Sequence, residues 1–411
     1  MRIGVVGLGY VGLPLAVAFA QAGQDVVGVD VDGRVVEALG RGQSHVEDVP
    51  DAVLNEIAEH LHPTTRYADL AKVDAIVVAV PTPLTRNREP DLQPLIASGT
   101  ALAGVLQGGQ LVVLESTTFP GTTRERFAPL LEESGLAAGR DFHLAFSPER
   151  IDPGRIDFTL RNTPKIVGGL TEQCRQKAAD LYELVCDEVI PVTTPESAEL
   201  SKLLENIFRS VNIALVNELA ILCDRMGIDV WEVVEAAATK PYGFMSFKPG
   251  PGMGGHCLPV DPFYLAWRAR EFDMQTEFVE LAGEVNQRMP YFCVERISRA
   301  LNDQAKPVKG SRVAIVGVSY KPGVGDLRES PALRIMRLLR GQGAELSYHD
   351  EHVPELADLG LRSEWPDEAD CVVIVTAHPG LDVERLVREA PLVVDFRGVT
   401  RGIEAPNLVR L

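Results

Sequence analysis

The stretch RIGVVGLGYVGLPLAVAFA, residues 2–20, decides the fold of the amino-terminal part of this chain. Residues 2–6 are mostly apolar and β-branched, as in a strand that is buried on both faces. Three glycines follow in the pattern GxGxxG, and an apolar helical pattern continues to about residue 22. Strand, glycine-rich turn and helix in this order predict the first unit of an α/β sheet.

The same alternation continues downstream. A second strand is expected over Asp25–Val29, and it ends in Asp30. Further apolar runs at 75–80, 111–114 and 142–146 alternate with helical patterns. This alternation predicts a parallel sheet that is covered by helices on both faces.

Composition narrows the class of protein. The chain has 411 residues, of which 45% are hydrophobic and 24% charged, as in globular proteins of two or three domains. Its 40 basic and 58 acidic residues sum to −18, which argues against a nucleic-acid partner. We found no uninterrupted apolar run of membrane length and no signal-peptide pattern, so no membrane association is expected. Six cysteines without a CxxC pattern suit the reducing cytoplasm: Cys174, Cys186, Cys223, Cys257, Cys293 and Cys371.

The carboxy-terminal part repeats the opening pattern. Residues 312–320 match residues 2–10 in register, and the second strand of each half ends in an aspartate, Asp30 or Asp350. Ser319 takes the place of the second glycine, so this half is expected to bind something other than a dinucleotide. We predict two doubly wound, Rossmann-like α/β domains.

A helical region is expected between these domains. The sequence Thr-Thr-Pro-Glu at 193–196 has the features of a helix start, and no proline or glycine follows before Gly227. A helix of about thirty residues could join the domains and form a homodimer contact. The Gly- and Pro-rich stretch 240–262 is expected to be a binding loop. The predicted domains are 1–193, which binds the dinucleotide, 194–304, which is central, helical and dimerising, and 305–411.

The glycine turn predicts a dinucleotide site. Gly7 permits the tight turn, Gly9 lets the backbone approach a pyrophosphate, and Gly12 lets the helix pack on the strand. Asp30 would accept hydrogen bonds from the adenosine ribose and repel a 2′-phosphate, which favours NAD over NADP. Arg34 could instead neutralise such a phosphate, or it is a solvated side chain. The turn expected to hold the pyrophosphate is Gly7, Leu8, Gly9, Tyr10, Val11 and Gly12.

A second group of candidates is the segment Gly-Gly-His-Cys-Leu-Pro-Val-Asp at 254–261. A lone cysteine is usually structural, but a thiol in a glycine loop can be approached by a ligand, and its thiolate is a nucleophile. The flanking glycines, Gly254 and Gly255, together with His256 and Asp261, favour a reactive role for Cys257. The neighbouring His256 stays unassigned, because adjacency in sequence does not place its ring near the sulfur.

Polar residues on the expected long helix form a third group. Lys202 and Asn206 are four residues apart and therefore share one face. They could stabilise a developing oxyanion, although a lysine in an apolar stripe is more often a surface residue whose ammonium reaches water.

Three segments that follow strands add further candidates. Thr117 could hold a water molecule, or it could cap the next helix. Glu149, followed by Arg150, is a candidate acid or base. Lys321 and Arg328 follow the first strand of the second domain and could bind an anionic ligand, or they could form a surface ion-pair cluster.

Taken in this order, the motifs resemble the nucleotide-sugar 6-dehydrogenases of the UDP-glucose/GDP-mannose dehydrogenase family. The resemblance runs from GLGYVG at 7–12, through GGHCLPVD at 254–261, to YKP at 320–322 and DLRESP at 326–331. It implies an amino-terminal NAD-binding domain, a central helix that builds a dimer and a carboxy-terminal domain that holds the UDP-sugar.

The resemblance also implies a four-electron reaction with two NAD molecules. Cys257 would trap the aldehyde formed at the sugar C6 as a thiohemiacetal, and its oxidation would give a thioester that water hydrolyses to the uronic acid. Lys202 and Asn206 would stabilise the oxyanion, and Glu149 would act as base in hydrolysis. The remaining roles by resemblance are Asp261 and Thr117 at the reacting water, Thr82, Thr117 and Arg328 at the cofactor, and Glu149, Arg150, Lys202, Asn206, Gly254 and Lys321 at the substrate.

Departures from the UDP-glucose branch favour a different sugar. Pro153 replaces its second glutamate, Val260 replaces its lysine beside the aspartate, and Val35 replaces a basic residue after the ribose aspartate. The sequences PTPL, SPERIDPG and GHCLPVDP resemble the UDP-N-acetylhexosamine branch, and UDP-N-acetylglucosamine is the favoured substrate. UDP-glucose and UDP-N-acetylmannosamine stay open.

Two other classes of function compete with this one. A two-electron NAD dehydrogenase of hydroxy acids would need no thiol, and a non-catalytic nucleotide-sugar-binding protein would not reduce NAD. No metal is expected, because His60 and His62 beside a proline are better explained as a surface turn.

Overall fold

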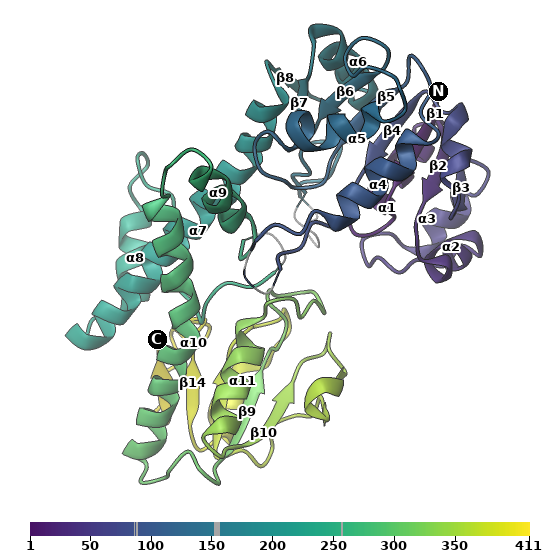
Figure 1. The fold of residues 1–411 in the computed structure, drawn as a ribbon. Helices are drawn as coiled ribbons and strands as arrows, with labels where there is room; N and C mark the ends of the chain where they lie inside the picture. Colours follow the sequence, from purple (N-terminus) through teal and green to yellow (C-terminus); the bar gives the residue numbers. More distant parts are fainter. Residues whose placement is uncertain (86, 88, 152–156, 256–257) are drawn as a thin grey trace. The chain divides into compact units, whose positions relative to one another are not determined.

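The computed structural model describes residues 1–85, 87, 89–151, 157–255 and 258–411. The chain divides into two compact units. Unit 1 comprises Met1–Glu205 and Phe263–Met274, and unit 2 comprises Asn206–Pro262 and Gln275–Leu411. Each unit contains one of the predicted α/β sheets, which confirms the predicted fold class (Figure 1).

Unit 1 is built on an eight-stranded sheet of order β3-β2-β1-β4-β5-β6-β7-β8. All neighbouring strands are parallel except β6 and β7, which are antiparallel. Five of these strands, β1, β2, β4, β5 and β6, lie where the sequence predicts strands, whereas β3 was not expected. The strands are β1 (Arg2–Val6), β2 (Asp25–Val29), β3 (Leu61–Thr64), β4 (Ala75–Val78), β5 (Leu111–Leu114), β6 (His143–Phe146), β7 (Lys165–Gly169) and β8 (Val189–Val192). His62 therefore lies on β3, and the expected surface turn at 60–62 is wrong for this residue.

Helices cover both faces of this sheet, because successive residues of each buried strand point to opposite sides. Val5 and Val77 pack with α1 and α6 on one face, whereas Val6 and Val78 pack with α4 and α5 on the other. The helical segments are α1 (Gly12–Gln21), α2 (Gly33–Gly40), α3 (Asp51–Glu56), η1 (Tyr67–Lys72), α4 (Gln93–Ala103), η2 (Thr122–Phe127), α5 (Ala128–Glu132) and α6 (Glu172–Tyr182).

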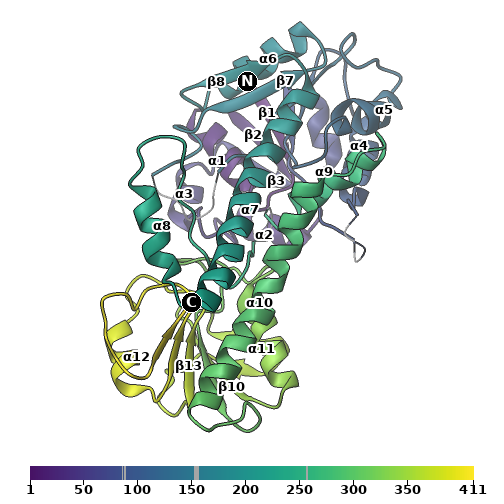
Figure 2. The ribbon, with the colours of Figure 1, turned by 90° about the vertical axis from the view of Figure 1, so that its left-hand side faces the viewer.

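The predicted long helix is α7, Pro195–Met226, with 32 residues. The Thr194 hydroxyl accepts a hydrogen bond from the Ser197 amide at 3.1 Å, which caps its start. Within unit 2, α7 lies beside α10 (Glu277–Asp303), and the buried Asn217 donates to Asn286 at 2.9 Å (Figure 2). The shorter helices nearby are α8 (Val230–Ala238) and α9 (Asp261–Arg270). The expected loop over 240–262 therefore ends at the start of α9.

By length and composition alone, α7 could cross a membrane, because its most apolar window has a mean hydropathy of 1.3. About 44% of that window is buried inside the protein. A buried core helix passes the same test, and α7 carries Lys202, Asn206 and Asn217 among its buried residues. Three polar side chains of this kind are typical of a core helix rather than of a lipid-facing span.

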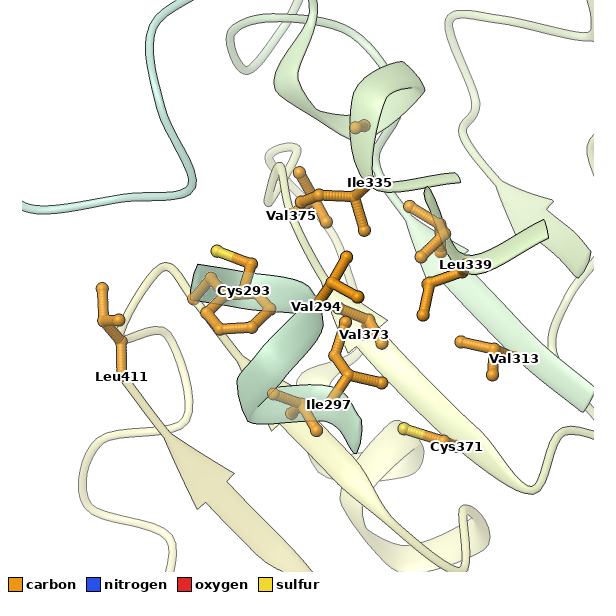
Figure 3. Packing of buried hydrophobic residues seen from close by; sticks show 14 of the residues in the cluster. Cys293, Val294, Ile297, Val313, Ile335, Leu339, Cys371, Val373, Val375 and Leu411 are labelled. Atoms are coloured by element: carbon orange, nitrogen blue, oxygen red, sulfur yellow. The ribbon is translucent and has the colours of Figure 1, made fainter. Parts of the chain in front are cut away.

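Unit 2 contains a five-stranded parallel sheet of order β10-β9-β13-β14-β15. On one face, side chains of α10 and α11 pack against the central strands, as Figure 3 shows for Val294, Ile335 and Val373. Leu386 of α12 packs on the opposite face. The elements are β9 (Arg312–Val316), α11 (Pro331–Gly341), β10 (Glu345–His349), β11 (Glu355–Leu356), η3 (Ala357–Leu359), β12 (Leu361–Arg362), β13 (Cys371–Ile374), α12 (Val383–Glu389), β14 (Val393–Asp395) and β15 (Leu408–Arg410).

Candidate functional site

The glycine turn of unit 1 has the geometry that dinucleotide binding requires. Gly7 has a φ of +90°, and a Cβ there would lie 2.5 Å from the Ala79 carbonyl oxygen. A Cβ on Gly12 would lie 1.8 Å from the Gly7 carbonyl oxygen. By contrast, a Cβ on Gly9 would meet no atom within 4 Å. Gly7 and Gly12 are thus required by the fold, whereas the open space at Gly9 fits the approach of a ligand phosphate.

Asp30 lies at the end of β2, as predicted, and is only partly buried. Its carboxylate accepts hydrogen bonds from the amides of Leu8 and Asp32, both at 2.9 Å. The side chain of Arg34 is 91% exposed and forms an ion pair with Asp32 at 2.7 Å. Of the two readings of Arg34, the structure favours the solvated one.

Thr82 and Thr117 lie together in unit 1. The Thr82 hydroxyl donates to the Thr117 carbonyl oxygen at 2.7 Å, and the Tyr264 hydroxyl donates to the Thr82 carbonyl oxygen at 2.6 Å. Thr82 therefore links the segments that follow β4 and β5. Nothing in the sequence pattern singled out Tyr264, whose role depends on a contact between residues 182 positions apart.

Glu199 of α7 fixes the same region from another side. Its buried carboxylate accepts hydrogen bonds from the Gly121 amide at 2.6 Å, the Thr123 amide at 2.8 Å and the Thr123 hydroxyl at 2.7 Å. Burial raises the pKa of Glu199 to about 7. The loop that begins with Thr117 is thus attached to α7 at its far end. The predicted alternative, in which Thr117 caps a helix, does not apply, because the next helical segment begins at Thr122.

Glu149 follows β6, as expected, and its side chain is 15% exposed. One carboxylate oxygen accepts from the Ile151 amide at 2.5 Å, and the other lies 3.5 Å from the Lys165 ammonium. Burial raises the pKa of Glu149, but the charge of Lys165, the Ile151 hydrogen bond and the charge of Lys202 outweigh burial and lower it. Glu149 is therefore ionised at neutral pH, as a base must be.

Arg150 is engaged within unit 1. Its guanidinium forms an ion pair with Glu205 at 2.8 Å and donates to the Pro164 carbonyl oxygen at 2.6 Å. These contacts fix the segment that carries Glu149.

Lys202 lies on α7 with only 8% of its surface exposed. Among the described residues its ammonium forms no ion pair. A buried ammonium without a carboxylate partner is costly, and such lysines are rare outside functional sites. The surface alternative considered for Lys202 is therefore wrong, and a cation remains available for a ligand oxygen.

Asn206 and Asp261 form a buried pair in unit 2. The Asn206 amide donates to the Asp261 carboxylate at 2.5 Å, and Asp261 is 1% exposed. Asp261 is the first residue of α9, where the helix dipole favours a negative charge. Cys257 and His256 lie outside the described residues, whereas the other five cysteines are all buried.

The two glycines before His256 pack against the loop after β9. A Cβ on Gly254 would lie 2.6 Å from Cβ of Tyr320, and Gly255, with a φ of +88°, would place one 2.9 Å from the Tyr320 ring. The Gly255 amide also donates to the Arg328 carbonyl oxygen at 2.9 Å. The cysteine segment and the loop of Lys321 and Arg328 are thus brought together, although they are more than sixty residues apart.

The two cations of that loop differ in their surroundings. Arg328 forms a bidentate ion pair with Asp326, with its closest N–O distance at 2.6 Å. The Lys321 ammonium lies 5.9 Å from the centre of the Tyr320 ring. The ion-pair alternative therefore applies to Arg328, whose charge is locally balanced.

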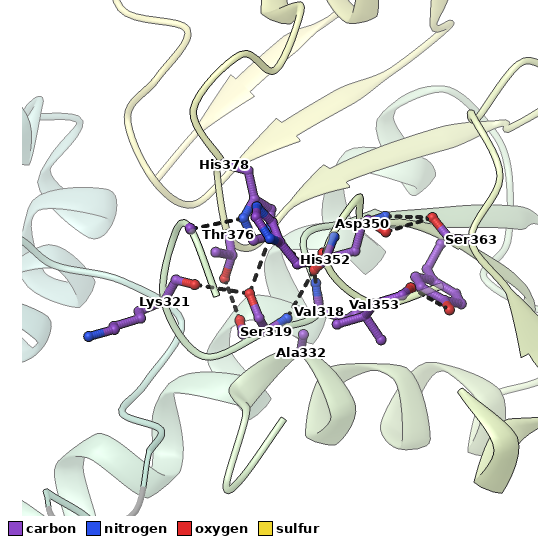
Figure 4. Close-up of polar contacts among 12 residues, drawn as sticks. Val318, Ser319, Lys321, Ala332, Asp350, His352, Val353, Ser363, Thr376 and His378 are labelled. Carbon is purple, nitrogen blue, oxygen red and sulfur yellow. Dashed lines mark hydrogen bonds and ion pairs between the residues drawn. The ribbon is translucent and has the colours of Figure 1, made fainter. Parts of the chain in front are cut away.

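A buried network behind this loop was not expected from the sequence (Figure 4). Asp350 accepts from the Val318 amide at 2.8 Å and from Nε2 of His378 at 3.0 Å. Because Nδ1 of His378 accepts from the Gly323 amide at 3.1 Å, Nε2 carries the proton. The sequence marked Asp350 as the counterpart of Asp30 but gave no signal for His378.

Comparison with known proteins assigns the chain to a family. Three models of the UDP-glucose/GDP-mannose dehydrogenase family match it, the NAD binding domain over residues 1–186, the central domain over 196–288 and the UDP binding domain over 314–402. The chain belongs to this family. It is an NAD-dependent UDP-sugar dehydrogenase, and the predicted family and cofactor are confirmed.

Relatives match along most of the chain. The UDP-N-acetyl-D-mannosamine dehydrogenase of Pyrococcus horikoshii is 37% identical over 98% of this chain and 100% of its own length. A solved structure of the UDP-D-ManNAc dehydrogenase from Pyrococcus horikoshii superposes with a TM-score of 0.91 at 35% identity and covers 100% of this chain and 99% of its own. The UDP-N-acetyl-D-glucosamine 6-dehydrogenase of Pseudomonas aeruginosa is 38% identical over 86% of this chain and 83% of its own length.

Proposed function

We propose that this family member oxidises the C6 alcohol of a UDP-N-acetylhexosamine to the uronic acid through a covalent intermediate on Cys257. The observation that carries the proposal is the buried pair of Asn206 and Asp261. Asp261 is the first residue of α9 and follows Cys257 by four residues in the sequence. A fixed amide and a carboxylate four residues along the chain from a cysteine suit acyl chemistry on its thiol.

The residues of unit 1 fit NAD. The open space at Gly9, the positive φ of Gly7 and the start of α1 would hold the pyrophosphate, and Asp30 would accept from the ribose. NAD, when bound, accepts the hydride that leaves C6 in each oxidation. Thr82, whose hydroxyl donates a hydrogen bond to the Thr117 carbonyl oxygen, would shape the cofactor site through its backbone.

Cys257 retains the aldehyde between the two oxidations. In the first, the C6 hydroxyl loses its proton to water and Lys202 stabilises the oxyanion. The Cys257 thiolate then forms a bond to C6, and Asn206 would stabilise the oxygen of this adduct. After the second hydride leaves C6, the product is a thioester.

Glu149 acts in the last step. It takes a proton from water, the resulting hydroxide adds to the thioester carbon, and the C–S bond breaks to release the acid and the Cys257 thiolate. Asp261 and Thr117 would position the reacting water. The buried cysteines cannot replace Cys257, because burial raises the pKa of Cys186 to about 11 and that of Cys371 to about 12.

The acetamido sugar is the finer part of the proposal. The sequences PTPL and SPERIDPG resemble the UDP-N-acetylhexosamine branch, and within it we favour UDP-N-acetylglucosamine, for which the Pseudomonas aeruginosa relative is named. UDP-N-acetylmannosamine is the second candidate, because the Pyrococcus horikoshii relative, which matches over 98% of this chain, is named for it. We place Lys321 and Gly254 at the substrate, and Arg328 at the cofactor.

We also propose that the enzyme is a cytoplasmic homodimer. Exposed apolar side chains recur along α7 at spacings of three, four or seven residues, which places them on one stripe that a second copy could cover. They are Leu200, Leu204, Phe208, Leu215, Leu219, Leu222 and Met226. In analytical ultracentrifugation, the wild type should sediment as a dimer and the Leu204→Glu, Leu215→Glu variant as a monomer. A monomeric wild type would refute this.

The test of the function is a substrate panel with NAD. We expect two NADH per sugar with an N-acetylated UDP-hexose and much slower turnover with UDP-glucose or GDP-mannose. Cys257→Ser should abolish uronate release, whereas the matched Cys223→Ser variant should retain it. Full turnover by Cys257→Ser would exclude the covalent route, and one NADH per substrate would indicate a two-electron dehydrogenase.

A further inference from the structure

Four side chains meet in a buried cluster behind Glu149. Glu115 follows β5, Lys165 begins β7, and Tyr182 ends α6. Lys165 is 2% exposed, and Glu115 and Tyr182 are equally inaccessible. None of these three was a candidate from the sequence, and the proposed reaction assigns them no role.

The sheet topology explains why they meet. β5 and β6 are parallel, so Glu115 and Glu149 both follow the carboxyl edge of the sheet. β7 runs antiparallel to β6, with Phe146 opposite Gly168. The start of β7 therefore lies at the same edge, and Lys165 is placed beyond the end of β6, next to Glu149.

One ammonium serves two carboxylates in this cluster. Lys165 forms a short ion pair with Glu115 and lies 3.5 Å from the Glu149 carboxylate. The Tyr182 hydroxyl donates to the other oxygen of Glu115 at 2.5 Å. A buried cation fully balances only one of two anions, so the two glutamates compete for it.

The protonation states follow from this competition. Burial raises the pKa of Glu115 to about 7, against the opposing charge of Lys165. The pKa of Lys165 is raised, because the two carboxylates outweigh its burial. Lys165 is thus charged throughout the neutral range, whereas Glu115 exchanges its proton within it. Tyr182, whose pKa is raised well above its usual value by burial, stays a hydrogen-bond donor.

We propose that Lys165 is a positioning residue for Glu149, holding its carboxylate ionised and oriented for thioester hydrolysis, and that Glu115 is the member of the pair that takes up a proton as the pH falls. The inference rests on the proposed function, in which Glu149 is the base. Other titratable groups that act on the cluster are Lys202 of α7, whose charge also favours ionised Glu149, and the Cys186 thiol after α6.

Two substitutions should affect the pH profile of uronate release differently. Lys165→Met removes the cation, so the acid limb of kcat should move up by about one pH unit or more. Glu115→Gln replaces a group that is already protonated at the pH where Glu149 titrates, so the acid limb should stay close to that of the wild type. KM for NAD should stay within about twofold in both variants, because the cofactor turn is untouched.

Three further variants control for folding and charge. Lys177→Met removes an exposed lysine of α6 and should leave the profile unchanged. Lys165→Arg keeps the charge and should restore most of the acid limb. If Lys165→Met fails to fold, the double variant Glu115→Gln, Lys165→Met removes both members of the ion pair and should still show the upward shift. An unshifted acid limb in Lys165→Met, or a shift of the same size in Glu115→Gln, would refute the inference.

A separate outcome identifies failure of the proposed function. If Glu149→Gln releases uronate at the wild-type rate, Glu149 is not the base, and the positioning role proposed for Lys165 is refuted as well. If Glu149→Gln stalls at the thioester, detected as a mass increase on the intact protein, the base role stands. The pH profiles of the Lys165 and Glu115 variants then test this inference alone.

Discussion

The two Rossmann-like sheets start in nearly the same way but treat one aspartate differently. Gly7 and Gly317 both have positive φ, and each amide donates to the second strand of its sheet, to Val29 at 2.8 Å and to His349 at 2.9 Å. Asp30 then uses its carboxylate for two backbone amides and stays partly exposed, whereas Asp350 is 1% exposed.

His378 accounts for the difference. Its Nε2 lies 3.0 Å from the Asp350 carboxylate, which also accepts from the amides of Val318 and Ser319. The Ser319 hydroxyl donates to the Lys321 carbonyl oxygen at 3.0 Å, in the position where the first sheet has Gly9. In the second turn, the polar groups are therefore hydrogen-bonded within the protein. In the first turn, the corresponding groups can bind a ribose and a pyrophosphate.

The largest effect is expected for Asp350→Ala. Removing this acceptor leaves several buried donors without a partner, and the free energy of unfolding should fall by about 3–5 kcal/mol. Asp30→Ala should lower the free energy of unfolding by less than about 1 kcal/mol, because the amides that donate to Asp30 can reach water instead. Urea unfolding of both variants measures this, and equal losses would contradict the comparison.

Gly9→Ser should make the first turn resemble the second. Since a Cβ at this position meets no protein atom, the melting temperature should change little. Affinity for NAD should fall by roughly 100-fold, about 2.7 kcal/mol, because the side chain occupies the space needed by the pyrophosphate. Calorimetric titration with NAD measures the loss. An unchanged affinity would show that the phosphate does not approach Gly9.

Asp30→Ala should have a smaller effect on the cofactor. We expect NAD affinity to fall about tenfold, or about 1.4 kcal/mol, because hydrogen bonds from the ribose to a charged acceptor are lost. The preference for NAD over NADP should narrow, because repulsion of a 2′-phosphate is removed. Fluorescence titration with both cofactors tests this, and Asp32→Ala is the matched control. An unaltered preference would place the ribose elsewhere.

The smallest effect concerns pH. Burial raises the pKa of Asp350, but hydrogen bonds from His378 and from the Val318 and Ser319 amides outweigh burial and lower it. A carboxyl whose pKa is lowered by folding contributes stability that is complete above its unfolded value of about 3.9 and is lost as pH falls through the folded value.

Replacing His378 by Gln should therefore reduce the loss of stability between about pH 5 and pH 2.5 by about 1 kcal/mol. Denaturant unfolding at both pH values measures it, with His352→Gln as a control that leaves the Asp350–His378 bond in place. The same acid dependence in the His378 variant and the wild type would show that this bond does not lower the pKa of Asp350.

Local pattern was enough to predict part of the molecule. The GxGxxG turn, the aspartates at 30 and 350, and the long uninterrupted run after Pro195 each depend on residues close in sequence, and the structure places the turn and α7 where the pattern predicts them. Candidates at strand ends, such as Glu149, followed from the rule that ligands bind at the carboxyl edge of a parallel sheet.

What the pattern could not supply were partners distant in sequence. Lys165 reaches Glu149 only because β7 reverses direction. Glu199 reaches Gly121 across 78 residues, and His378 reaches Asp350 from the loop after β13. A lone lysine, glutamate or histidine carries no local sign of such a role.

The sequence by itself determined the two α/β sheets, the dinucleotide turn and the family, because backbone conformation and the period of apolar residues are local properties. Only the tertiary structure decided which charges are buried, which carboxylates share a cation and which aspartate remains open to a ribose. These depend on desolvation and on distances between residues far apart in the chain, and both are fixed only once the sheets have packed.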